Sequence, residues 1–266
     1  MREVEITWVN VAEGKCERRM DVVAEEVPLH VLLNETRVVS ILCSPGLLKE
    51  LAVGHLFSEG FLRGLGEVRE VRLEDDGRCF VVLKSEVDVE KRLELVQPFG
   101  RLIVSACGSA DAWPLLKLVD RIKGLKVKSD AVVRAGVIVE CVRHLSSLAG
   151  EYRQTGGVHV ASLNRVADGG LVAFAEDVGR HNAVDKVIGA GVLGGVDFGG
   201  CFLVLSGRLS GDVVLKCARV GVPVVASRAA ALSSGVEVAE RCGVGLVGFV
   251  RGSKLNVYAC VERVRL

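Results

Sequence analysis

Short apolar runs separated by polar, glycine-bearing turns dominate the C-terminal part of the chain. Val158–Leu163 and Leu171–Ala175 flank Asp168-Gly169-Gly170, and this pattern predicts a hairpin. Strand-length and helix-length segments then alternate. We expect helices over Ala183–Ile188, 211–219 and 235–241, and strands over 201–205, 222–226, 245–250 and 255–260. Alternation with short connections predicts helices packed on a mostly parallel sheet.

The first part of the chain predicts strands around one helix. Ser44-Pro45 opens this helix, because apolar residues follow it at helical spacing. Strands are expected over Val4–Val11, Arg19–Val23, Val68–Leu73, Phe80–Leu83 and Leu102–Val104, with a hairpin joining Val31–Leu33 to Val38–Leu42. Two further helices are expected, over Pro114–Ile122 and Val132–Tyr152.

A lysine-rich stretch over 123–130 marks a joint between two parts of the chain. We therefore expect two domains, a smaller β-rich N-terminal domain over 1–125 and a C-terminal domain over 126–266. The fold class that follows is α/β in the C-terminal domain and α+β for the whole chain.

The composition favours a cytoplasmic protein with a large core. Half of the 266 residues are apolar, and the net charge is only +1. That balance argues against a broad nucleic-acid surface, which needs clustered excess cation. The mean hydropathy is high at +0.38, yet no run approaches the roughly 18 apolar residues that span a bilayer. The charged, alternating start Met1–Ile6 does not resemble a signal peptide, so we expect no membrane association.

Cys107 stands out among nine cysteines, none of which forms a C-x-x-C pair. It lies in a loop of small residues, 105–110, after an expected strand. Gly108 lets the backbone turn, and a helix starting beyond it would stabilise a thiolate. The alternative is an ordinary buried cysteine in a turn. The other eight are expected to be small core residues, and without paired cysteines we expect no structural metal.

Two polar segments precede expected strands or helices in the C-terminal domain. Glu176-Asp177-Val178-Gly179-Arg180-His181-Asn182 lies between a strand and a helix, where site residues are common in α/β folds. It is equally readable as a charged helix cap. Thr155-Gly156-Gly157-Val158-His159 indicates close approach of the backbone to a ligand, or a tight helix stop. A lone histidine such as His159 is more often a core residue.

Three further loops follow consecutive strands. Ser206-Gly207-Arg208 precedes Ser210, which can cap the next helix, and Ser227-Arg228 repeats the arrangement one strand later. Both loops lie at carboxyl ends of neighbouring strands, where open α/β sheets bind ligands, so we expect a phosphate-bearing ligand. Phe249-Val250-Arg251-Gly252-Ser253-Lys254 forms a turn that can close over that ligand, or is a solvated hairpin tip.

Taken in order, these motifs resemble the FdhD family of formate dehydrogenase accessory sulfur carriers. The N-terminal part matches through Glu26-Val27-Pro28-Leu29-His30 and the segment 51–60. The most specific stretches are 155–159 and 176–186, and Ser206-Gly207-Arg208 and Gly248–Gly252 complete the set. The resemblance covers nearly the whole chain.

The resemblance implies a function and a fold. Family members accept sulfur from a cysteine desulfurase as a persulfide. They pass it to the molybdenum or tungsten bis-guanine-dinucleotide pterin cofactor of formate dehydrogenase, so that cofactor is their cargo. The persulfide position matches Cys107, and the cofactor-binding stretch matches Phe249–Lys254, where GDP or a GMP-like nucleotide can also sit. A cytidine-deaminase-like C-terminal domain without zinc and a homodimer are also implied.

The chain departs from the family at three places. Many relatives carry a second loop cysteine where this chain has Ala110, so Cys107 would act as a single-cysteine carrier. His55 replaces a common Phe, and Ala231-Leu232 replace a Pro-Thr pair in a ligand loop. Two other functions remain open. One is a cofactor chaperone that moves no sulfur, and the other is a nucleoside deaminase, which the missing zinc motif disfavours.

Overall fold

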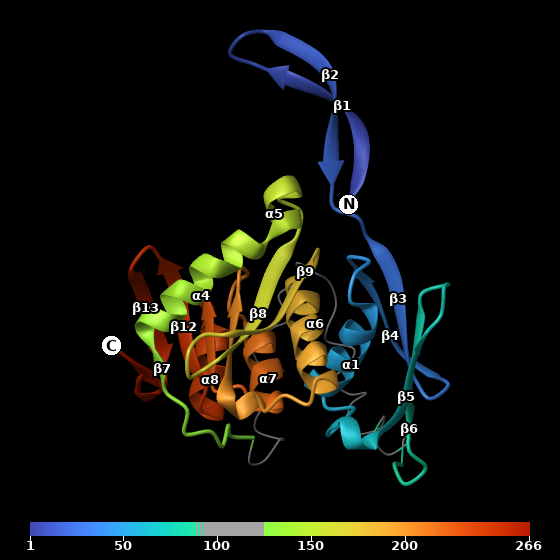
Figure 1. Ribbon diagram of the computed structural model, residues 1–266, viewed down its shortest axis with the longest axis vertical. Helices are drawn as coiled ribbons and strands as arrows, with labels where there is room; N and C mark the ends of the chain where they lie inside the picture. Colours follow the sequence, from blue (N-terminus) through green and yellow to red (C-terminus); the bar gives the residue numbers. More distant parts are fainter. Residues whose placement is uncertain (89, 91, 93–124) are drawn as a thin grey trace.

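The computed structural model describes residues 1–88, 90, 92 and 125–266. At its centre lies a six-stranded sheet with the strand order β13-β12-β11-β10-β8-β9 (Figure 1). Its strands are β8 (His159–Arg165), β9 (Leu171–Asp177), β10 (Cys201–Leu205), β11 (Val224–Ser227), β12 (Gly245–Arg251) and β13 (Lys254–Ala259). The expected strands of the C-terminal part are therefore all present, with ends shifted by one to two residues.

The expectation of a mostly parallel sheet is wrong. Only β10–β11 and β11–β12 pair in parallel, while β8–β9, β8–β10 and β12–β13 are antiparallel. The two hairpins explain the difference, because a short loop can join only antiparallel neighbours. The parallel strands at the centre still direct their carboxyl ends to one edge, and this edge carries the loops that are expected from the sequence to bind a ligand.

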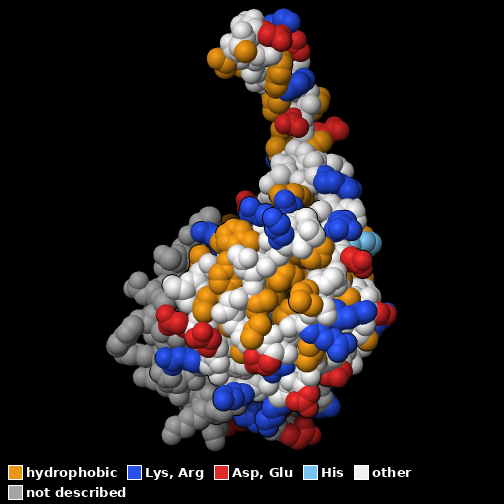
Figure 2. All heavy atoms as spheres, turned by 90° about the vertical axis from the view of Figure 1, so that its left-hand side faces the viewer, with side chains coloured by type: hydrophobic (Ala, Val, Ile, Leu, Met, Phe, Trp, Pro, Cys, Tyr) orange, Lys and Arg blue, Asp and Glu red, His pale blue; other side chains and the backbone are white. Residues whose placement is uncertain are grey.

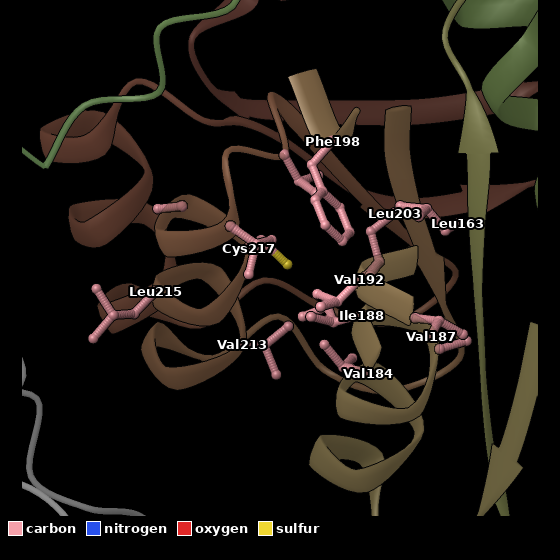
Figure 3. Close-up of a cluster of buried hydrophobic side chains, with 14 of the residues drawn as sticks. Leu163, Val184, Val187, Ile188, Val192, Phe198, Leu203, Val213, Leu215 and Cys217 are labelled. Carbon is pink, nitrogen blue, oxygen red and sulfur yellow. The ribbon is translucent and has the colours of Figure 1, made fainter. Parts of the chain in front are cut away.

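Helices cover both faces of this sheet. Helix α4 (Ala135–Leu148) packs on one face, and α6 (Arg180–Leu193), α7 (Gly211–Val220) and α8 (Ser233–Cys242) pack on the other. Strand β10 is apolar at every position because both of its faces are buried. Its residues Phe202 and Val204 join the cluster under α4, whereas Leu203 and Leu205 join the cluster under α6 and α7. Figure 3 shows Leu203 in that second cluster, beside Ile188 and Val192 of α6.

The N-terminal half forms a second sheet with the order β4-β3-β6-β5. Asn34, with a φ of 52°, makes the tight turn of the expected hairpin. The elements of this half are β1 (Arg2–Asn10), β2 (Lys15–Val23), β3 (Val27–Leu33), β4 (Thr36–Cys43), α1 (Leu48–Ser58), β5 (Val68–Leu73) and β6 (Arg78–Leu83). Strands β1 and β2 form a separate hairpin that projects from the body.

Two helix predictions need correction. Helix α1 begins at Leu48 rather than at Pro45, because Leu47 takes a left-handed conformation before it. The long helix expected over Val132–Tyr152 is divided at Ala149 into α4 and α5 (Gly150–Thr155), and Val133–Arg134 is a short strand. The remaining short elements are β7 (Val133–Arg134), β14 (Val264–Arg265) and 3-10 turns at Leu65–Glu67, Phe198–Gly200 and Val261–Arg263. Expected elements over Leu102–Val104 and Pro114–Ile122 lie outside the described residues.

The structure shows a mixed α/β fold, whereas the division into two domains near residue 125 stays a prediction. No helix in the described part of the chain is long and apolar enough to cross a membrane.

Helix α1 crosses α6 at two glycines. A Cβ at Gly54 would overlap the carbonyl oxygen of Asp185, and a Cβ at Gly189 would overlap that of Glu50. Only glycine permits this approach of two helix backbones. The crossing attaches the N-terminal half of the chain to the helical layer of the main sheet.

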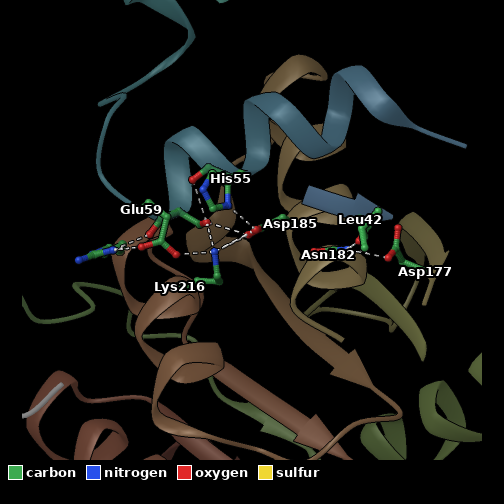
Figure 4. Close-up of polar contacts among 9 residues, drawn as sticks. Leu42, His55, Glu59, Asp177, Asn182, Asp185 and Lys216 are labelled. Atoms are coloured by element: carbon green, nitrogen blue, oxygen red, sulfur yellow. Dashed lines mark hydrogen bonds and ion pairs between the residues drawn. The ribbon is translucent and has the colours of Figure 1, made fainter. Parts of the chain in front are cut away.

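Buried charges surround the same crossing (Figure 4). The ammonium of Lys216, on α7, lies 2.9 Å from Asp185 Oδ2 and 2.6 Å from Glu59 Oε1. His55 Nδ1 lies 3.2 Å from Asp185, and Ser58 donates a hydrogen bond of 2.7 Å to it. Burial opposes ionisation of Asp185 and Glu59, but the charge of Lys216 outweighs burial and lowers the pKa of both carboxyls.

Replacing Gly54 by Ala should destabilise the protein by about 1–3 kcal/mol, because the methyl group forces α1 and α6 apart. Urea unfolding measures the change. Gly136→Ala is the matched control, since its site in α4 has open space for a Cβ, and it should be neutral or slightly stabilising. Equal stability of Gly54→Ala and the wild type would contradict the close crossing.

Replacing Lys216 by Met should cost about 3–5 kcal/mol at pH 7, because two buried carboxylates lose their shared cation. Both carboxyls have a lowered pKa in the folded wild type, so their contribution is present above about pH 4 and is lost as pH falls further. The difference in unfolding free energy between wild type and variant should therefore be largest above about pH 4 and should shrink as pH falls below that value. A difference independent of pH in urea titrations would argue against this network.

Candidate functional site

The carboxyl ends of β10, β11 and β12 bring three of the expected ligand loops into contact. Ser227 donates a hydrogen bond of 2.7 Å to the carbonyl of Gly207, and the Ala229 amide donates to Ser227 Oγ. The Phe249 amide in turn donates to the Ala229 carbonyl at 3.0 Å. The loops 206–210, 227–232 and 248–252 therefore form one continuous surface, as expected for neighbouring strands.

His159 belongs to this surface. Strand β8 runs antiparallel to β10, so its first residue lies beside the end of β10. His159 Nδ1 is 3.4 Å from Ser206 Oγ, and the adjacent Val160 amide donates to the same oxygen at 3.0 Å. Ser206 donates its own amide to the Val160 carbonyl at 2.9 Å. The histidine that the sequence alone treats as a core residue thus borders the loop after β10.

The N-terminus of α6 brings Arg180 and His181 to the same loop. A Cβ at Gly207 would come within 3.1 Å of Arg180 Cβ and 3.5 Å of His159 Nδ1. Gly207 therefore keeps the space in which Arg180 and His159 approach the loop. His181 Nε2 lies 3.5 Å from Asp212 Oδ2, at the start of α7. Asp212 ends the segment 206–212 that follows β10, and its pairing with His181 could not be predicted from the sequence, because an acid in a first helical turn is ordinary.

The electrostatics of the site favour an anion. Burial lowers the pKa of His159, and the positive charges of Arg180, His181 and Arg208 lower it further, so the ring is neutral near pH 7. Asp212 has a lowered pKa because its bond to His181 outweighs burial. One carboxylate thus faces several cationic groups that converge on the loop after β10.

Ser210 does not cap α7 as expected. Its side chain makes no capping hydrogen bond, and its buried Oγ has no partner among the described residues. The Gly211 amide, at the start of α7, instead donates a hydrogen bond of 3.1 Å to Ser234 Oγ.

Asp177 serves the fold rather than a ligand. It is fully buried and lies 2.6 Å from Lys186 Nζ, and it accepts the amide of Ser44 at 3.1 Å and that of Gly179 at 2.9 Å. Asn182 also donates to it. The expectation that the segment 176–182 binds a ligand therefore does not extend to the carboxylate of Asp177, which has no exposed surface.

Glu176 and the loop at 155–157 shape the edge of the site. Glu176 accepts the amides of Glu151 and Tyr152 and thereby fixes the start of α5. Gly156, with a φ of 63°, ends this helix in the left-handed conformation, and Thr155 Oγ1 accepts the Gly157 amide. The helix-stop interpretation of this motif is correct.

The turn after β12 borders a cleft of about 360 Å³. Val250 is buried, whereas the Phe249 ring is about one-third exposed and lies 5.0 Å from the Arg251 guanidinium. Arg251 Nε donates to the carbonyl of Arg228. Gly252, with a φ of 60°, makes the turn before Ser253 and Lys254, which are exposed. The cleft also has Arg143 of α4 in its wall, so three arginines surround an apolar floor.

Cys107 and its loop lie outside the described residues, so its role stays a prediction. Of the eight described cysteines, Cys16 is exposed, so the expectation that all eight lie in the core is wrong for this residue, which stands on the hairpin of β1 and β2. Burial raises the pKa of Cys43 and Cys217 to about 12 and that of Cys79 and Cys141 to about 11. These buried thiols are unreactive near pH 7, as expected for small core residues.

Comparison with known proteins identifies the family. The model of the FdhD/NarQ family matches residues 24–265. A curated relative named sulfur carrier protein FdhD, from Sulfolobus acidocaldarius, is 35% identical over 100% of this chain and 99% of its own. One of the same name from Anaeromyxobacter sp. (strain K) is 37% identical over 92% and 89%.

A solved structure shares the fold. The crystal structure of a formate dehydrogenase accessory protein from Desulfotalea psychrophila superposes with a TM-score of 0.78 at 27% identity, covering 99% of this chain and 98% of its own. Together with the family match over nearly the whole sequence, this likeness shows that the chain belongs to the FdhD/NarQ family.

Proposed function

We propose that the chain is a sulfur carrier for formate dehydrogenase. It takes sulfur from a cysteine desulfurase as a persulfide on Cys107 and transfers it to the molybdenum or tungsten bis-guanine-dinucleotide pterin cofactor, which is its cargo. The names of its relatives support the carrier role. The assignment of the cargo rests on one observation, the cationic surface at the carboxyl ends of β10, β11 and β12.

The loop after β10 has the chemistry to bind a phosphate. Gly207 leaves the backbone open, and Arg180 and Arg208 supply positive charge around it. A neutral His159 can donate or accept a hydrogen bond there, depending on its tautomer. The diphosphate of a dinucleotide carries negative charge, so it binds such a cationic surface more strongly than a neutral metabolite does.

The turn at 249–254 can bind the guanine base of the same cargo. The Phe249 ring and the Arg251 guanidinium can stack on a purine, while Val139 and Val142 of α4 help to line the cleft beside them. Because the turn and the loop after β10 belong to one surface, a nucleotide can reach from one to the other. GDP is therefore a suitable probe for this site.

Cys107 is the thiol that we assign to the sulfur. The donor's persulfide bond breaks as the Cys107 thiolate attacks the outer sulfur, a new S–S bond forms, and the donor leaves as a thiolate. This exchange needs an accessible thiolate, and burial raises the pKa of the four core cysteines named above. We place this exchange in the cytoplasm, where thiols stay reduced.

Incubation of the protein with cysteine and a cysteine desulfurase should add one sulfur atom to its mass, and Cys107→Ala should abolish the gain. Intact-mass spectrometry measures both. Cys16→Ala is the matched control, because Cys16 is the exposed described thiol, and this variant should still gain the sulfur. Full formate dehydrogenase activity in cells that contain only Cys107→Ala would instead indicate a cofactor chaperone that moves no sulfur.

Replacing Arg208 by Ala should weaken GDP binding about tenfold, since one charge-assisted contact to phosphate is lost. Isothermal titration calorimetry measures the affinity. Arg37→Ala, at an exposed position of β4, should leave the affinity unchanged. Unchanged affinity in Arg208→Ala, or an equal loss in both variants, would show that the loop after β10 does not bind the nucleotide.

A further inference from the structure

A buried ring nitrogen of His181 lacks a hydrogen bond at the ligand surface. Its Nε2 atom has no hydrogen-bond partner among the described residues. Asp212 Oδ2 lies 3.5 Å away, which is close enough for an ion pair but too far for a good hydrogen bond. Buried polar atoms are normally satisfied, and site contacts often shorten when a ligand binds. The pair can therefore close by a small movement once Nε2 carries a proton, because an imidazolium donates from both nitrogens.

Asp212 is suited to hold a charged imidazole ring. It lies in the first turn of α7, where the helix dipole favours a carboxylate. Burial raises its pKa, but the contacts with His181 and the charges of Arg180 and Lys216 outweigh burial and lower the pKa. Asp212 is therefore ionised near neutral pH and offers His181 a counterion.

The other four histidines of the chain, all of them described, lack this arrangement at the ligand surface. His30 lies on β3, His55 lies at the crossing of α1 and α6, and His144 is exposed on α4. His159 does border the loop after β10, but burial and the neighbouring positive charges lower its pKa and keep it neutral. His181 is thus the histidine of this surface that has a carboxylate beside it to stabilise an added proton.

The electrostatic field at His181 is set by nearby groups. The net charge of the chain is only +1, and acidic and basic side chains both surround the apolar patch in Figure 2. Charges farther away than about 10 Å are largely screened by salt. At the loop after β10, the cations Arg180 and Arg208 oppose a positive charge on His181, whereas Asp212 favours it. A bound anion that offsets the two arginines therefore shifts this balance towards the imidazolium.

A second set of charges borders His181 from a cavity of about 380 Å³. The charged or titratable groups in the rest of its wall are Glu26, His55, Asp185 and Lys216. Lys216 and Asp185 lie 2.9 Å apart and neutralise each other. Asp177, at the end of β9, is likewise paired with Lys186 at 2.6 Å. These ion pairs form within the core without a ligand, so a bound anion acts mainly on the groups at the loop after β10.

We propose that binding of a nucleotide diphosphate is coupled to uptake of a proton by His181, with Asp212 as the positioning residue that holds the charged ring. The coupling rests on the proposed function, because it requires the phosphate site at the loop after β10. The diphosphate offsets the charges of Arg180 and Arg208, the solvent supplies the proton, and Nε2–H of His181 then donates to Asp212 Oδ2. By linkage, the nucleotide binds more tightly as pH falls through the range in which histidines titrate.

Isothermal titration calorimetry of the full chain with diguanosine diphosphate tests the coupling. The bridging diphosphate of this probe keeps its charge between pH 6 and 8, whereas the terminal phosphate of GDP titrates near pH 6. Two pH 7 buffers with different ionisation enthalpies give the number of protons taken up per ligand. The wild type should take up about half a proton, which corresponds to about tenfold tighter binding at pH 6 than at pH 8.

Three variants assign the proton. His181→Gln should abolish the uptake and make the affinity independent of pH. Asp212→Asn should still bind the probe but take up less proton at pH 7, because the imidazolium loses its counterion. His144→Gln is the matched control, since it removes an exposed histidine of α4, and it should behave as the wild type. Circular dichroism checks that each variant is folded, and the wild type and Asp212→Asn decide the test if His181→Gln is not.

Binding by the wild type without proton uptake would overturn the coupling and leave the phosphate site in place. Uptake that persists in His181→Gln would assign the proton to another group, such as His159, and would also overturn it. Wild-type uptake in Asp212→Asn would show that Asp212 does not position the charged ring. Failure of the wild type to bind the probe at any pH would instead contradict the proposed function, and the coupling with it.

Discussion

The close crossing of α1 and α6 is the constraint on which the rest of the structure depends. Two glycine positions let the helix backbones touch, and the Lys216 ammonium neutralises two buried carboxylates beside them. The same helix α6 begins with Arg180 and His181 at the ligand surface. Anything that displaces α1 therefore moves Arg180 and His181 at the start of α6.

A second set of bonds fixes the start of α6 from the other side. Lys186 is fully buried and bonds to Asp177 and to the carbonyl of Ser44, and Asn182 bridges Asp177 and the carbonyl of Leu42. These bonds connect the end of β4 to the end of β9 and to α6. The motif 176–186 is thus largely a structural joint, from which Arg180 and His181 extend towards Gly207 and Asp212.

Local patterns predicted the elements well and predicted their pairing poorly. Runs such as Phe202–Leu205 are long enough and apolar enough to specify a buried strand, and the loops after β10 and β11 meet because adjacent strands end together. Strand direction depends on which segments become neighbours, which composition does not encode. The role of Asp177 was missed because its partners Lys186 and Ser44 are distant or undistinguished in sequence. A charged pair sealed in the core looks the same in sequence as a pair at a site.

The shared core also has a consequence for how the protein unfolds. Leu51 and Leu56 of α1 belong to the same cluster as Val184 and Ile188 of α6 and Leu203 of β10. The N-terminal half of the chain therefore has no interior of its own to protect, whereas the cluster under α4 belongs to the C-terminal half alone. Amide hydrogens in α1 and in β10 should exchange with solvent through one common opening, and the N-terminal half should not persist as a folded fragment after proteolysis between the halves.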